Sequence, residues 1–320
     1  MKVVILDGFS VTQSDLTWEP LSNAAGLQKP VELTVYPRTR ADETIGRIAG
    51  AEAVLTNKVL ITDDIMAASP ALRYIGVLAT GYNVVDVEAA HRRGIVVTNI
   101  PAYSTDSVAQ LVFAHLLNVT NSVAHYAERR SVWPSSPDFC WIDTQLTELA
   151  GKTFAIRGLG NIGTKVARIA AAFGMRVLAV TSREPEALPV GVEKATWDTA
   201  LAEADVLSLH CPLTPSTREI INAEALARMR SSAILINTGR GPLVNEADVA
   251  EALRSGRLAA YCADVLSTEP PAADNPLLSA PRCFLTPHIA WATREARQRL
   301  LSIAVANLIA YAAGHPQNKV

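Results

Sequence analysis

The chain has 320 residues, of which 49% are hydrophobic and 19% charged, and its formal net charge is −2 at pH 7. That length predicts about two domains and a large core, and a charge near zero gives no electrostatic term that favours nucleic acid or an anionic membrane. No apolar stretch approaches the ~18 residues of a membrane-spanning helix. The four scattered cysteines form neither a CxxC pair nor a metal-ligand spacing. We therefore expect a cytoplasmic protein with reduced thiols, no metal site, and no nucleic-acid or membrane partner.

Short β-branched runs alternate with helical patterns along the whole chain. The runs expected to be strands are Val3–Leu6, Leu33–Tyr36, Ala53–Thr56, Tyr74–Leu78 and Ile95–Thr98 in the first half, then Thr153–Ile156, Arg176–Val180, Val206–Leu209, Ala233–Asn237, Ala259–Ala263 and Phe284–Thr286. Each is apolar on both faces and is followed by a loop or helix signal, which is typical of parallel strands with crossover helices. Two such series predict two α/β domains, each with a doubly wound parallel sheet.

The boundary between the two series is marked by Pro101 and by a helix that follows it. Ser104 to Asp106 can cap this helix, and apolar residues recur with helical spacing from Val108 to Val123. A last helix, about 293–313, has no strand after it and is expected to pack back on the first domain. We predict a substrate domain made of 1–101 and 290–320, and a dinucleotide-binding domain, 102–289, inserted into it.

Residues 131–147, SVWPSSPDFCWIDTQLT, form an irregular segment with two Trp and one Phe. Aromatic surface of this kind usually has a partner to bury it. Two interpretations stay open, namely packing on its own domain and contact with a second subunit.

A glycine-rich fingerprint follows the first expected strand of the inserted domain. In TFAIRGLGNIG (153–163), Gly158, Gly160 and Gly163 form G-x-G-x-x-G, with Asn161 and Ile162 between the last two, and a helix is expected over 164–173. The first glycine permits a tight turn, the second lets the backbone approach a pyrophosphate, and the third allows close helix–strand packing. The N–H groups at the helix start favour the anion, so we expect a dinucleotide site.

The next strand bears on which dinucleotide is bound. NAD sites usually end this strand with Asp or Glu, which binds the ribose 2′-OH, whereas this chain has Thr181, Ser182 and Arg183. Hydroxyls beside an arginine suit a 2′-phosphate, so we expect either NADP or NAD as cofactor, with NADP favoured. Glu184 leaves an alternative open, because it could neutralise Arg183 or reach the ribose itself.

Three further loops follow strands of the inserted domain and carry Arg240, Glu269 and His288. Loops at the carboxyl ends of strands converge on the ligand in a doubly wound sheet, so these three side chains can share one site. Arg240 can hold a carboxylate or carbonyl oxygen, His288 can donate a proton near neutral pH, and Glu269 can orient the imidazole. His288 is expected where a strand ends and a helix begins. Cofactor contacts are also expected from Cys211, Pro212, Thr217, Thr238, Gly239, Asp264 and Ala290. For Cys211 and Pro212, core packing stays open as the alternative.

Taken together, these motifs resemble those of the D-isomer-specific 2-hydroxyacid dehydrogenases over nearly the whole chain. The matching stretches are ATGYNVVDVEAA (79–90), GLGNIG (158–163), LHCPLTPST (209–217), INTGRG (236–241), DVLSTEPP (264–271) and TPHIA (286–290). The resemblance implies a Rossmann domain inserted into a flavodoxin-like domain, and catalytic roles for Arg240, Glu269 and His288. It also implies that backbone N–H groups at Thr80 and Gly81 bind the substrate carboxylate. Asn57 and Lys58 lie in a loop that faces the site in such folds, so we expect them to contact the substrate. Arg157 departs from the family, which commonly has a small or apolar residue before the first glycine.

The implied reaction reduces a 2-keto acid to a D-2-hydroxy acid. A hydride passes from the nicotinamide to the carbonyl carbon, and His288 protonates the oxygen. DGFSVTQSDLTWEPL, near the start, most resembles the glycerate dehydrogenases, also called hydroxypyruvate reductases, so hydroxypyruvate is the expected substrate and glyoxylate the second. The family implies a homodimer, in which Trp141 could reach the neighbouring subunit's site. The alternatives are a phosphoglycerate or lactate dehydrogenase and a dinucleotide-sensing corepressor on the same fold.

Overall fold

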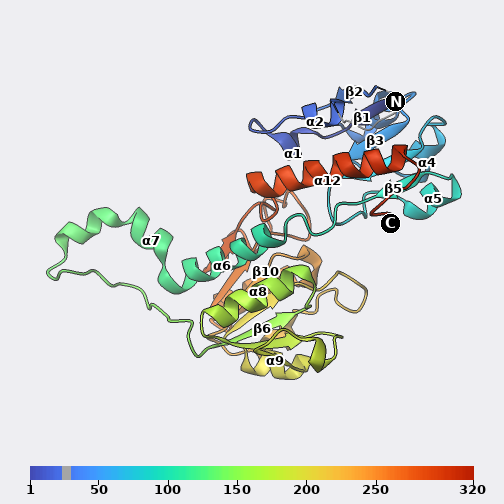
Figure 1. Cartoon of the computed structure of the whole chain (residues 1–320). Helices are drawn as coiled ribbons and strands as arrows, with labels where there is room; N and C mark the ends of the chain where they lie inside the picture. Colours follow the sequence, from blue (N-terminus) through green and yellow to red (C-terminus); the bar gives the residue numbers. More distant parts are fainter. Residues whose placement is uncertain (24–29) are drawn as a thin grey trace. The chain divides into compact units, whose positions relative to one another are not determined.

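The computed structural model describes residues 1–23 and 30–320, which divide into two compact units (Figure 1). Met1–Ser104 and Trp291–Val320 form the first unit, and Thr105–Ala290 form the second. Within the described residues, no helix is long and apolar enough to cross a membrane.

The first unit is built on a five-stranded parallel sheet in the order β2-β1-β3-β4-β5. Its strands are β1 (Lys2–Ile5), β2 (Glu32–Val35), β3 (Ala53–Thr56), β4 (Tyr74–Val77) and β5 (Val96–Thr98). This is the flavodoxin-like order. Its helices are α1 (Phe9–Thr12), α2 (Glu19–Ser22), the 3₁₀ helix η1 (Ala41–Glu43), α3 (Thr44–Arg47), α4 (Asp63–Ala67), α5 (Val87–Arg92) and α12 (Arg294–Ala312).

Apolar residues fill both faces of this sheet. One cluster joins the strands to α1, α2 and the C-terminal helix α12, and it includes Val3, Leu55, Leu300 and Leu308. The other cluster joins the opposite face to α4 and α5. Helix α12 starts from the Thr293 cap, whose side chain accepts a hydrogen bond from the Ala296 N–H. The last helix therefore belongs to the core of the unit that begins the chain.

The second unit has a seven-stranded parallel sheet in the order β12-β11-β10-β9-β6-β7-β8. Its strands are β6 (Thr153–Arg157), β7 (Arg176–Val180), β8 (Val192–Lys194), β9 (Val206–Leu209), β10 (Ile234–Asn237), β11 (Ala260–Ala263) and β12 (Cys283–Leu285). The order reverses direction at β6, as in Rossmann folds, which places the ligand crevice at the carboxyl ends of β6 and β9. The fold class predicted from the sequence is confirmed for both units.

Helices cover both faces of this second sheet (Figure 1). One apolar cluster joins the sheet to α6 (Thr105–Asn121) and α8 (Asn161–Ala172), and the other joins it to α9 (Trp197–Glu203), α10 (Ala223–Arg228) and α11 (Glu246–Arg254). The remaining elements are α7 (Val123–Glu128) and the 3₁₀ helices η2 (Arg130–Ser135), η3 (Pro185–Ala187) and η4 (Gly241–Leu243).

One strand was missed and three expectations about helices were wrong. The sequence did not predict β8, a three-residue edge strand. The helix expected over 164–173 begins at Asn161, directly after Gly160. The helix expected to reach Val123 ends at Asn121, because Ser122 has a left-handed φ of 51° and a second helix starts after it. No helix begins at His288, which has a φ of 54° and lies in the loop between β12 and α12.

Candidate active site

Arg240, Glu269 and His288 lie on loops that leave three neighbouring strands. The ends of β10, β11 and β12 are in register, with Asn237 beside Ala263 and Ala263 beside Leu285. Because the strands are parallel, all three loops leave the same edge of the sheet. The expected convergence of these loops therefore follows from the observed topology.

His288 and Glu269 are in direct contact. Nδ1 of His288 lies 2.6 Å from Oε2 of Glu269, and about a third of each side chain is exposed. The other carboxylate oxygen of Glu269 accepts a hydrogen bond from the Leu266 N–H at 3.0 Å. The carboxylate is thus held by its own loop while it fixes the imidazole, which leaves Nε2 to exchange a proton with a ligand.

Asp264 holds the His288 loop in place. Its side chain is buried, and its oxygens accept hydrogen bonds from Thr286 Oγ1 at 2.6 Å, the Ile289 N–H at 2.9 Å and the Ala290 N–H at 2.7 Å. These bonds supply a reason for the positive φ of His288, since both residues after it are tied to one carboxylate. Asp264 was expected to contact the cofactor, but the structure uses both its oxygens within the protein.

A buried histidine extends this network. Nε2 of His115, on α6, lies 3.2 Å from Thr286 Oγ1, and burial lowers the pKa of His115. His115 is thus a buried partner of the loop that carries His288.

Arg240 is joined to the Glu269 loop through its neighbour Gly241. A Cβ on Gly241 would lie 2.0 Å from the carbonyl carbon of Leu266 and 2.4 Å from the Ser267 N atom. The backbone after Arg240 therefore packs directly on the backbone that precedes Glu269. Asn237 fixes the same turn, because its side-chain amide donates to the Arg240 carbonyl at 2.9 Å. The Arg240 side chain is exposed, and its Nη1 donates to the Gly239 carbonyl at 2.8 Å.

The glycine fingerprint forms a cradle that side chains would fill. A Cβ on Gly158, whose φ is 98°, would lie 2.6 Å from the Cys211 N atom, and one on Gly163 would lie 2.1 Å from the Gly158 carbonyl oxygen. A Cβ on Gly160 would meet no protein atom within 4 Å. Gly160 is the N-cap residue of α8, and it has no side chain that could occupy the free N–H groups at the helix start. The first and third glycines thus permit close packing, and the second leaves open space at a helix N-terminus, which suits a pyrophosphate.

The other residues expected around the cofactor divide into two groups. The Thr238 hydroxyl is buried and is one of the few buried polar atoms of the described residues without a hydrogen-bond partner, so it is available to a ligand. Thr217 is also buried, but its hydroxyl donates to the Pro212 carbonyl at 2.7 Å and accepts from the Thr214 N–H at 2.8 Å. Thr217 therefore shapes the loop that carries Cys211 and Pro212.

The turn after β7 exposes a hydroxyl and a guanidinium group to solvent. Thr181 Oγ1 accepts the Arg183 N–H at 3.2 Å, and the Ser182 and Arg183 side chains are exposed. Glu184 lies 3.7 Å from Lys194 Nζ, and no ion pair between Glu184 and Arg183 occurs among the residues described. Of the two alternatives for Glu184, neutralisation of Arg183 is therefore not observed.

In the first unit, a buried carboxylate that the sequence did not single out shapes the loop after β3. Asp7 accepts hydrogen bonds from the N–H groups of Asn57 at 2.8 Å, Lys58 at 2.6 Å and Val59 at 3.3 Å. Burial raises the pKa of Asp7, and these three bonds oppose that rise. The Asn57 side chain is buried and donates to the Leu78 carbonyl at 2.6 Å, whereas the Lys58 side chain is exposed.

Asn57 thus connects this loop to the loop after β4, where Thr80 and Gly81 lie. The Thr80 hydroxyl donates to the Ile100 carbonyl at 2.8 Å, and the Asn99 side chain donates to the Thr80 carbonyl at 2.8 Å. Neither bond uses the N–H groups of Thr80 or Gly81, which are the groups expected to bind a carboxylate.

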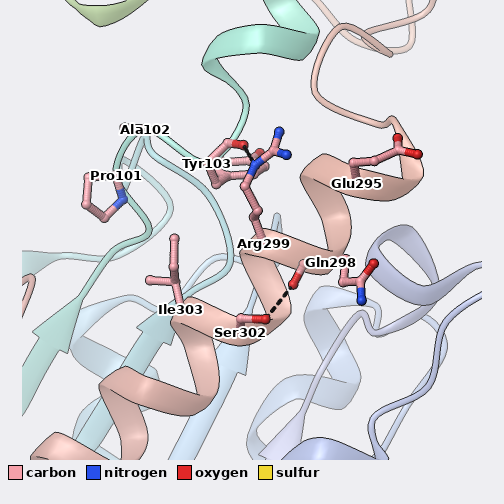
Figure 2. A pocket seen from close by; sticks show the side chains of 8 residues that line it. All are labelled: Pro101, Ala102, Tyr103, Glu295, Gln298, Arg299, Ser302 and Ile303. Carbon is pink, nitrogen blue, oxygen red and sulfur yellow. Dashed lines mark hydrogen bonds between the residues drawn. The ribbon is translucent and has the colours of Figure 1, made fainter.

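A separate hollow of about 680 Å³ lies in the first unit between the segment after β5 and α12 (Figure 2). Arg299 crosses it, and its Nε donates to the Tyr103 carbonyl at 2.9 Å. The residues that line it are Pro101, Ala102, Tyr103, Glu295, Gln298, Arg299, Ser302 and Ile303. None of the residues expected to bind substrate or cofactor is among them.

The aromatic segment 131–147 and helix α7 form an arm that projects from the sheet of the second unit (Figure 1). Trp133, Phe139 and Ile142 are 57%, 91% and 67% exposed. Trp141 instead packs edge-on against Tyr126 of α7, with ring centroids 5.5 Å apart. A pocket of about 520 Å³ opens among these rings. Packing on its own domain therefore accounts for Trp141 but not for the exposed Phe139.

Comparison with known proteins assigns the chain to a family. Residues 113–290 match the family model described as D-isomer specific 2-hydroxyacid dehydrogenase, NAD binding domain. The chain is 44% identical to a hydroxypyruvate reductase of Blautia hydrogenotrophica, over 100% of this chain and 99% of that protein. It is 40% identical to a glycerate dehydrogenase of Methylorubrum extorquens, over 91% and 92% of the two chains. A crystal structure of a glyoxylate reductase from Paecilomyes thermophila superposes with a TM-score of 0.84 at 27% identity, and covers 100% of this chain and 98% of that one. With a fingerprint cradle that fits a nicotinamide dinucleotide and a histidine–carboxylate pair on loops that leave the same edge of the same sheet, the chain belongs to the D-isomer-specific 2-hydroxyacid dehydrogenases, an oxidoreductase family.

Proposed function

We propose that this enzyme reduces hydroxypyruvate to D-glycerate, and glyoxylate to glycolate as its second reaction. The observation that carries the proposal is the His288–Glu269 contact of 2.6 Å, on loops locked to that of Arg240. The choice of substrate is supported by the names of the most similar relatives, a hydroxypyruvate reductase and a glycerate dehydrogenase.

The proposed roles follow from the atoms that each residue presents. A bound nicotinamide dinucleotide supplies the hydride. Glu269 accepts a hydrogen bond from Nδ1 of His288, so Nε2 gives a proton to the substrate oxygen and accepts it in the reverse direction. Arg240 binds the substrate and stabilises negative charge as it develops on that oxygen. Asp264 acts through the backbone of the His288 loop as a positioning residue.

The residues of the first unit have a binding role in this proposal. Backbone N–H groups of Thr80 and Gly81 bind the substrate carboxylate, and Lys58 adds a positive charge. Asn57 is buried and bonded to Leu78, so we now assign it to positioning these loops instead of touching the substrate.

The cofactor residues support NADP(H) as the preferred form. Gly158, Gly160 and Gly163 hold the pyrophosphate at the start of α8, and Asn161 and Ile162 continue that helix end. Thr181, Ser182 and Arg183 present hydroxyl and guanidinium groups without a carboxylate in the position that binds a ribose 2′-OH, which favours a 2′-phosphate.

The remaining cofactor residues surround the rest of the dinucleotide in this proposal. The buried Thr238 hydroxyl, with no protein partner, contacts the cofactor, and Gly239 and Ala290 line the same edge of the sheet. Cys211 and Pro212 form a wall that Thr217 supports.

The arm supports a homodimer, because Phe139 is 91% exposed and a second subunit would cover it. Light scattering should give the mass of two chains, and Phe139→Ser should weaken association. Val190, which is 101% exposed elsewhere in the same unit, provides a matched control as Val190→Ser. A monomeric wild-type protein would end this part of the proposal, including any contact of Trp141 with the neighbouring site.

The test of function is a substrate panel. Hydroxypyruvate, glyoxylate, pyruvate and 3-phosphohydroxypyruvate should each be assayed with NADPH and with NADH, and kcat/KM compared. The highest value is expected for hydroxypyruvate with NADPH. A preference for the phosphorylated acid or for pyruvate would identify a phosphoglycerate or lactate dehydrogenase, and the absence of turnover on every acid would favour a dinucleotide-sensing role.

A further inference from the structure

Arg157 occupies the position in the second sheet where the strand order reverses. It is the last residue of β6, immediately before Gly158, and its register partners are Val180 of β7 and Leu209 of β9. Ligands of doubly wound sheets bind outside the carboxyl ends of the strands at this point. Arg157 is therefore one strand away from the Thr181–Arg183 turn.

The side chain of Arg157 is directed to the α9 face of the sheet. Side chains alternate between faces along a strand, and Ile156 belongs to the cluster under α6 and α8. The Arg157 guanidinium carbon lies 5.3 Å from the ring centroid of Trp197, the first residue of α9. Burial raises the pKa of the Cys211 thiol, and the charge of Arg157 partly opposes that rise. The guanidinium also hydrogen-bonds with the Cys211 side chain, so it lies between the first residue of α9 and the loop after β9.

This cation has no anionic partner in the part of the chain that the structure describes. Among residues 1–23 and 30–320, no carboxylate lies within 4.0 Å of Arg157 or of Arg183, and Glu184 pairs with Lys194. Arg157 is half-buried, and a partly desolvated charge is costly unless an anion compensates it. Stacking on Trp197 fixes one face of the guanidinium. One of its N–H groups is shared with the Cys211 thiol, and the others remain to bind an anion.

We propose that Arg157 is a second cationic ligand of the cofactor's 2′-phosphate, acting with Arg183 to select NADP(H) over NAD(H). This inference rests on the proposed use of NADP(H). The adenosine ribose of a dinucleotide binds at the end of the strand after the fingerprint, here β7, whose last residue pairs with Arg157. Guanidinium groups bind phosphate through several parallel hydrogen bonds, so two arginines on adjacent strand ends can share one phosphate.

The test is calorimetric binding of 2′,5′-ADP and of 5′-AMP to the full chain, without substrate or turnover. The variants are Arg157→Met, Arg157→Lys and Arg183→Met, and Arg168→Met on the exposed face of α8 is the control for loss of one positive charge. Arg157→Met should weaken 2′,5′-ADP binding by ~10- to 100-fold, the effect of losing a hydrogen bond to a charged group. Binding of 5′-AMP should change by less than ~3-fold, and Arg157→Lys should restore part of the loss. Melting curves of each variant establish that it is folded.

Each outcome separates this inference from the proposed cofactor preference. If the wild type binds both nucleotides equally, the NADP(H) preference fails and the role of Arg157 fails with it. If Arg183→Met removes the preference while Arg157→Met keeps it, NADP(H) stands and Arg157 is no ligand. Equal weakening of 5′-AMP and 2′,5′-ADP by Arg157→Met would show that Arg157 supports the adenosine pocket without reading the phosphate.

Discussion

Replacing Gly241 with alanine should separate the loops of Arg240 and Glu269 and so reduce turnover. The new Cβ would lie 2.0 Å from the Leu266 carbonyl carbon, 2.1 Å from its oxygen and 2.4 Å from the Ser267 N atom. All three are backbone atoms, so no side chain can rotate away. Ordinary contact begins at 3.4 Å, so the two loops would have to move apart by about 1.4 Å. A misplacement of 1 Å can already cost ~10²-fold in rate.

The assay is steady-state reduction of hydroxypyruvate, with the folded fraction measured for each variant. We expect Gly241→Ala to lower kcat by ~10²-fold and to cost ~1–3 kcal/mol in unfolding free energy, as overpacking does. Gly46→Ala is the matched control, because a Cβ there meets nothing within 4 Å. A Gly241→Ala enzyme that keeps kcat within about twofold of wild type would refute the claim that these loops must stay locked together for catalysis.

Three further predictions concern the network behind the same site. Glu269→Gln removes the charge beside Nδ1 of His288 and should lower kcat by ~10²-fold with KM for cofactor unchanged, and equal kinetics would count against its orienting role. Asp264→Asn replaces one acceptor oxygen with an NH₂ group that faces a donor, and it should cost ~3 kcal/mol in chemical denaturation, so near-native stability would show that the three bonds matter little. Burial lowers the pKa of His210 from its ordinary 6.5 to about 4, so the unfolded chain binds the extra proton between these values and stability should fall as pH drops through that window. The loss at pH 5 is at most ~2 kcal/mol, and His210→Gln should flatten the pH dependence of unfolding, whereas an unchanged slope would assign it to other groups.

Buried strands and the glycine fingerprint could be predicted from the sequence because their signals are local. Runs such as 177–180 are apolar on both faces, and a parallel sheet buries both faces. Strand β8 was not predicted because it lacks this signal: Val192–Lys194 is a short edge strand with two exposed polar residues. Its pairing with β7 is determined by the neighbouring strand, which no local pattern reveals.

Positioning residues of the site were harder to find because their partners are distant in sequence. Asp7 shapes the loop of Asn57 and Lys58 from fifty residues away. Gly241 looks like an ordinary glycine of a motif, and its necessity appears only when Leu266 packs on it. The residues that could donate protons or bind phosphate were recognisable by their chemistry, whereas the residues that hold them depend on tertiary contacts.

Turnover of the His288→Ala enzyme with hydroxypyruvate and NADPH tests the central claim most directly. The account predicts a folded protein that still binds the cofactor fragment 2′,5′-ADP but reduces hydroxypyruvate ~10²- to 10⁴-fold more slowly, because the proton donor is gone. A His288→Ala enzyme with wild-type kcat would contradict it.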